Sequence, residues 1–145
     1  MHTPCEESPF VSIERENIHP AVRKLATATC LVALLPISMG ALVTTLQAGM
    51  AFADWPSSDG HNMLLYPWFR DFAAHPDKFT EHGHRLAGML IGFVSVCLAL
   101  TSYFIERRWV KLFTTAILLS VIVQGALGGA RVLLDRQILA MLHSV

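Results

Sequence analysis

The sequence predicts an all-α integral membrane protein, a transmembrane four-helix bundle with three full spans and the start of a fourth. Only 15% of its 145 residues are charged, whereas an average soluble domain carries about 25%. The formal net charge is zero, so no basic surface indicates a nucleic-acid partner. Three charge-free stretches are each close to or above the ~20 residues that cross a bilayer as a helix. These stretches are residues 25–53, 86–105 and 112–130.

The positive-inside rule orients the spans. Arg23 and Lys24 end a polar tail at residues 1–24, which is therefore expected in the cytoplasm. The short segment 106–111 carries three basic residues and is expected on the same side. The spans are expected at 25–48, 81–105, 112–134 and 138–145, the last of them incomplete.

Residues 49–80 are expected to form a long external loop. No cysteine lies in it, so no disulfide is predicted there. Trp55, Tyr66 and Trp68 suit a segment lying at the membrane interface. A loop of about 30 residues is also often functional, so a lid over a site at the outer face is the alternative interpretation.

Ionisable residues at the outer end of the second span predict a functional site. Glu81 and His84 are three residues apart and share one helical face, which Gly88 continues. His82 points about 200° away from His84 around a helix, so the two rings cannot reach one ligand. The spacing favours His84 as the inward histidine and leaves His82 to face the headgroups or the loop.

A second histidine, His143, follows an apolar stretch in the incomplete fourth span. At 1.5 Å per residue, His84 lies ~5 Å and His143 ~8 Å inside the outer boundary. Two histidines on different helices at similar depth are what a bis-histidine haem needs, and Gly88 and Gly92 leave space for a porphyrin. The alternative is that both are hydrogen-bonding histidines at the membrane surface. Zinc is less expected, because no cluster offers three or four ligands at the usual spacing.

Four segments follow one another along the chain, at residues 40–44 with 49–56, 81–88, 124–129 and 140–143. In this order they resemble the N-terminal half of the haem A synthase family. The resemblance covers roughly residues 25–145, and the E-x-x-H-R motif after a D-W-P loop is its most specific part. It departs at Phe52 and Ser58, where many bacterial members carry a cysteine pair.

The resemblance implies a fold of eight transmembrane helices in two similar halves, each able to hold one haem between two histidines. His84 and His143 are then the ligands of the haem iron of the substrate, haem O, and haem b is expected in the missing C-terminal half. Glu81 is the expected catalytic residue, which stabilises positive charge at the reacting methyl or acts as a base towards water. Arg85 is expected to bind a haem propionate or to snorkel to the headgroups.

The implied enzyme oxidises a ring methyl of haem O to a formyl group, which gives haem A for cytochrome oxidase. It would be a multi-pass protein of the cell's inner (plasma) membrane. Its expected partners are haem O, membrane lipids, a haem O synthase and an electron acceptor that the sequence leaves unidentified. A homo-oligomer is also left open.

Two other functions stay open at this point. A non-catalytic bis-histidine electron carrier of the cytochrome b kind needs the same histidines but has no use for Glu81. An inactive fragment is the second, because eight residues of helix reach only ~12 Å into a hydrocarbon core of ~30 Å. The chain is therefore expected to be cut inside the fourth helix of a longer enzyme, and to be unstable or inactive alone.

Overall fold

The computed structural model describes residues 18–144, and within this range the protein is all-helical. Three helices are long and apolar enough to cross a membrane, and a short fourth follows them. The predicted fold class is therefore confirmed. Residues 1–17 of the predicted tail, and Val145, lie outside the described residues. The helices are α1 (Pro20–Thr45), the 3-10 helix η1 (Trp68–Arg70), α2 (Asp71–Ala74), α3 (Pro76–Ile105), α4 (Arg108–Leu134) and α5 (Gln137–Ser144).

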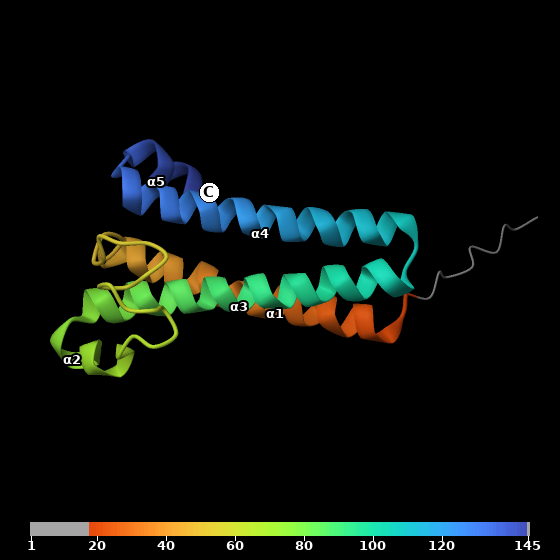
Figure 1. The fold of residues 1–145 in the computed structure, drawn as a ribbon, viewed down its shortest axis with the longest axis horizontal. Helices are drawn as coiled ribbons and strands as arrows, with labels where there is room; N and C mark the ends of the chain where they lie inside the picture. Colours follow the sequence, from red (N-terminus) through yellow and green to blue (C-terminus); the bar gives the residue numbers. More distant parts are fainter. Residues whose placement is uncertain (1–17, 145) are drawn as a thin grey trace, which may run out of the picture.

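The three long helices run antiparallel in chain order (Figure 1). Helix α3 packs against both α1 and α4, and α5 folds back along the end of α4. The loop that carries η1 and α2 lies at the same end of the bundle as α5 (Figure 1). We define this outer loop as residues 46–75.

The first and third helices begin five residues before the spans that hydropathy predicts. Both start on a proline, Pro20 and Pro76. Proline suits the first position of a helix, because its fixed φ is already helical and its missing N–H would have no partner there. His19 adds a cap to α1, since its Nδ1 accepts the Ala21 N–H at 3.2 Å. Hydropathy predicts the apolar part of a helix, whereas these residues set where it begins.

The end of the bundle opposite the outer loop is closed by direct contacts. Val22, Leu98 and Val110 form a buried apolar cluster that joins α1, α3 and α4. The hydroxyls of Ser102 and Thr114 contact each other across the α3–α4 turn. The three long helices are therefore fastened together at this end, and the candidate site lies at the other.

Candidate functional site

The fold brings His84 of α3 and His143 of α5 together at the outer-loop end of the bundle. Their ring centroids lie 5.8 Å apart and the ring planes meet at 73°. A metal ion between two imidazole nitrogens, each at about 2 Å, holds the two centroids roughly 6 Å apart. The two histidines predicted to act together therefore lie at a spacing that would suit two ligands of one metal ion.

Each of these histidines is anchored by a backbone carbonyl of the neighbouring helix. His84 Nδ1 lies 3.0 Å from the Pro36 carbonyl oxygen of α1, and His143 Nδ1 lies 3.0 Å from the Gln124 carbonyl oxygen of α4. A carbonyl oxygen only accepts, so Nδ1 carries the hydrogen and donates it. The Nε2 lone pair of a neutral ring is then free to bind a metal, as in most metal-binding histidines.

A glycine lies against each ring, four residues after the anchoring carbonyl. A Cβ on Gly40 would lie 3.2 Å from His84 Cε1, and a Cβ on Gly128 would lie 2.9 Å from His143 Cε1. The rings thus occupy the space where a side chain would begin. The α1–α3 pair and the α4–α5 pair hold their histidines by the same local arrangement.

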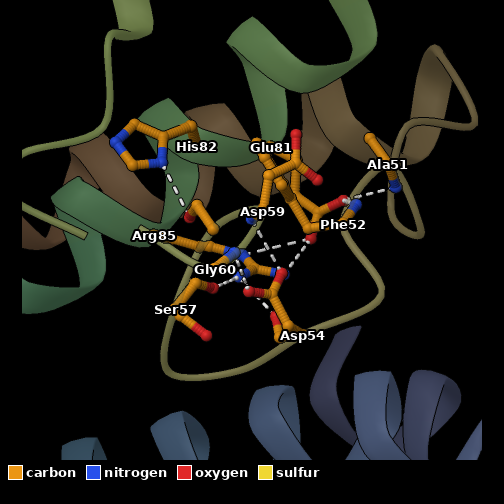
Figure 2. A network of polar contacts seen from close by, with 10 residues as sticks. Ala51, Phe52, Asp54, Ser57, Asp59, Gly60, Glu81, His82 and Arg85 are labelled. Atoms are coloured by element: carbon orange, nitrogen blue, oxygen red, sulfur yellow. Dashed lines mark hydrogen bonds and ion pairs between the residues drawn. The ribbon is translucent and has the colours of Figure 1, made fainter. Parts of the chain in front are cut away.

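The Glu81 carboxylate is buried and accepts four hydrogen bonds (Figure 2). Its Oε2 accepts the N–H groups of Ala51 at 2.7 Å and Phe52 at 3.3 Å. Its Oε1 accepts Arg85 Nη2 at 2.6 Å and Nε at 3.1 Å. A carboxylate offers about four lone-pair sites, so this one has little capacity left to take a proton from water. Of the two chemical roles predicted for Glu81, a fixed negative charge fits this geometry better than a base.

Arg85 fastens the outer loop to α3 (Figure 2). Its Nη1 donates to the carbonyl oxygens of Asp54 at 2.8 Å and Ser57 at 2.7 Å, in addition to the two bonds with Glu81. Four of the five N–H donors of an arginine are thus engaged by protein acceptors. The side chain is only 7% exposed. The guanidinium that was predicted to reach a propionate or the headgroups is therefore turned to the loop.

His82 lies beneath the outer loop. It is buried, and its Nδ1 lies 3.1 Å from Ser58 Oγ. The rings of Tyr66 and Phe52 pack beside it, with centroids 4.8 and 6.0 Å away. Of the two surroundings predicted for His82, headgroups or loop, the structure has the loop. The Phe52 side chain is fully buried, so the loop has a small apolar core of its own.

The outer loop also reaches α4, which the sequence did not predict. A Cβ on Gly129 would lie 2.5 Å from Trp55 Cδ2, so the indole packs directly on the α4 backbone. The Arg131 guanidinium covers Gly49 in the same way, with Nη2 2.1 Å from the place of a Cβ. The loop therefore bridges α3 and α4 at the end where His84 and His143 meet.

Sequence reasoning missed the residues that hold the histidines. Gly40, Gly128 and the carbonyls of Pro36 and Gln124 gave no signal of their role, because nothing in the sequence pairs them with a particular ring. Gly40 and Gly128 do lie inside the segments that resemble the haem A synthase family. Within residues 18–144, no three side chains of His, Cys, Asp or Glu gather as a metal site. An iron held here by two histidines therefore needs its remaining ligands from a porphyrin.

Comparisons with known proteins identify the family. A family model described as cytochrome oxidase assembly protein matches residues 3–144. A curated relative, the haem A synthase of Mesorhizobium japonicum, is 32% identical over 81 residues. The chain belongs to the haem A synthase family. The match covers 52% of this chain and 22% of the relative's length. No solved structure matches the chain. Membership in this family, together with three apolar helices, makes the chain a membrane protein.

Proposed function

We propose that this chain forms the haem O site of a haem A synthase, in which a ring methyl of haem O is oxidised to a formyl group. The observation that supports the proposal best is the pair His84 and His143, with ring centroids 5.8 Å apart. Both rings keep Nε2 free because Nδ1 donates to a carbonyl. The haem supplies the redox chemistry when bound. Water supplies the formyl oxygen, and an electron acceptor, still unidentified, takes the four electrons that leave the methyl group.

The protein residues bind and orient the substrate in this proposal. His84 and His143 bind the iron, and their carbonyl anchors fix the two ring planes. Glu81 lies one helical turn outward from His84 and places a fixed negative charge at the outer side of the site. Such a preorganised charge stabilises positive charge that develops at the reacting methyl. Arg85 contributes through the ion pair that holds Glu81 and the loop in place.

We further infer that the protein lies in the inner (plasma) membrane with its N-terminus in the cytoplasm. Arg23 and Lys24 lie near the start of α1, and this start is at the same end of the bundle as the basic segment 106–111 (Figure 1). Short basic segments favour the cytoplasmic side. The outer loop and the histidine pair then lie at the opposite, external side, where haem O would bind. The expected haem O synthase would deliver haem O to this site.

Purification of the chain with its bound pigment tests the proposal. The chain, co-expressed with a haem O synthase, should carry haem O or haem A, identified by mass after extraction. Its low-spin bis-histidine spectrum should disappear in His84→Ala and in His143→Ala. His61→Ala is the matched control, because His61 lies exposed on the loop. A pigment that is always haem b would support an electron carrier instead, and a spectrum that survives both ligand substitutions would refute the site.

The role of Glu81 has its own test. Glu81→Gln keeps the shape but removes the charge, so conversion of haem O should slow by about 100-fold while haem stays bound. Asp54→Asn is the control for a merely structural effect, because Asp54 accepts the Asp59 and Gly60 N–H groups within the loop (Figure 2). Conversion at the native rate by Glu81→Gln, or an equal loss in Asp54→Asn, would remove Glu81 from the chemistry.

A further inference from the structure

One arginine beside the histidine pair has no acidic partner among residues 18–144. Arg131 lies in the last turn of α4 and is half-buried. A cation partly withdrawn from water is costly unless an anion compensates it. The ion pairs of the described residues are Lys78–Asp59 and Glu81–Arg85, and neither includes Arg131.

The position of Arg131 is fixed by the outer loop. Its Nη2, Cζ and Nη1 lie 2.1, 2.8 and 3.0 Å from the place of a Cβ on Gly49, a buried residue of that loop. On α4, Arg131 follows Gly128, the residue on which the His143 ring packs, by three residues and therefore lies one turn away on the same face. A cation in the last turn of a helix interacts favourably with the negative end of the helix dipole. This interaction does not require the side chain to reach the loop. The guanidinium is instead held against the outer loop, one helical turn from the residue that contacts the His143 ring.

We propose that Arg131 binds a carboxylate of the tetrapyrrole held between His84 and His143, an inference that rests on the proposed function. A haem carries two propionate groups, and the planar fork of a guanidinium matches a carboxylate with two parallel hydrogen bonds. Arg85, for which the sequence predicts this contact, is engaged by Glu81 and by two loop carbonyls. Arg131, in contrast, forms no ion pair with an acidic residue of the described part of the chain, so its charge is not compensated there.

Two forms of one porphyrin distinguish a carboxylate contact from a structural role. The 145-residue chain in detergent micelles is titrated with ferric protohaem and with its dimethyl ester, in which both propionates are capped. Arg131→Gln should weaken binding of the free acid by tenfold or more, which equals about 1.4 kcal/mol. Its affinity for the ester should equal that of the unsubstituted chain. Arg131→Lys, which keeps the charge, should recover part of the loss.

The matched control is Arg136→Gln, because Arg136 is an exposed arginine at the same end, in the α4–α5 connection. It should bind both forms as the unsubstituted chain does. An equal loss for acid and ester in Arg131→Gln would mean a structural role and overturn the inference. Unchanged acid binding in Arg131→Gln, with binding lost in His84→Ala, would overturn the role of Arg131 alone. Haem binding that survives His84→Ala and His143→Ala would overturn the proposed function as well.

Discussion

Replacement of Gly128 by alanine tests most directly how the structure holds His143. The new Cβ would lie 2.9 Å from His143 Cε1, 3.2 Å from Nε2 and 3.4 Å from Nδ1. Non-bonded carbon atoms prefer separations of about 3.5–4.0 Å, so the ring has to move by roughly 0.6 Å or more. The same ring donates to the Gln124 carbonyl at 3.0 Å, and this movement lengthens or breaks that hydrogen bond.

The expected loss follows from the role of this hydrogen bond. Removing an outer partner of a metal-binding histidine typically costs 10–100-fold in metal affinity. We therefore expect Gly128→Ala to bind haem about 10–100-fold more weakly, measured by titration of the Soret absorbance. Gly40→Ala should lose less, because its Cβ would lie 3.2 Å from His84 Cε1 and a shift of a few tenths of an ångström relieves that contact.

Gly125→Ala is the matched control on the same helix, since a Cβ there meets no atom within 4 Å. It should bind haem like the unsubstituted chain. Its unfolding temperature should be equal or higher, because glycine is about 1 kcal/mol less favourable than alanine inside a helix. Equal haem affinities in Gly128→Ala and Gly125→Ala would refute the reasoning, and so would a larger loss in Gly40→Ala than in Gly128→Ala.

Two further predictions concern the outer loop. Gly129→Ala places a Cβ 2.5 Å from Trp55 Cδ2, so the loop should leave α4. Limited proteolysis should then cleave the loop severalfold faster. Gly92→Ala is the control, because a Cβ there meets open space, and its loop should be cleaved at the native rate. Burial raises the pKa of Asp54, but the N–H groups of Gly60 and Asp59 stabilise the ionised form and hold its pKa below the usual value. The stability contributed by Asp54 is therefore present above the unfolded pKa of ~3.9 and is lost as pH falls through the folded pKa. Amide-exchange protection of the Asp59 and Gly60 N–H groups should accordingly drop only below about pH 4. In Asp54→Asn this protection should be low already at pH 6. Protection that changes neither with pH nor with the substitution would contradict this prediction.

The fold class could be predicted because a bilayer restricts which residues a spanning helix can contain. A helix that crosses lipid has to exclude charge over ~20 residues, and the stretches that form α1, α3 and α4 do so. The helix starts could not be predicted from the same signal, because Pro20 and Pro76 lie in polar surroundings outside the apolar stretches. The turns within the outer loop depend on contacts such as Arg85 with the Asp54 carbonyl, which no local pattern encodes.

Apart from the pairing of His84 with His143, the site could be predicted where one helix decides the geometry. The spacing of Glu81, His82 and His84 on a single helix predicts which faces they share, and it correctly separates His82 from His84. The same kind of spacing could have predicted the ion pair of Arg85, because Arg85 follows Glu81 by four residues and lies on the same helical face. Its position next to His84 in the sequence does not place it on the same face, because consecutive residues point about 100° apart on a helix.

The position of each histidine ring depends on a neighbouring helix as well as its own. His84 is anchored to α1 and His143 to α4, so the distance between the rings depends on how the α1–α3 and α4–α5 pairs sit against each other. At one end, the packing of α3 on α4 around Val110 fixes these two helix pairs relative to each other. At the other end, the outer loop connects them, because it is fastened to α3 by Arg85 and lies on α4 through Trp55. The loop therefore helps to set the spacing of the two histidine rings. If these rings bind the haem as proposed, loosening the loop should weaken haem binding without any change to either histidine.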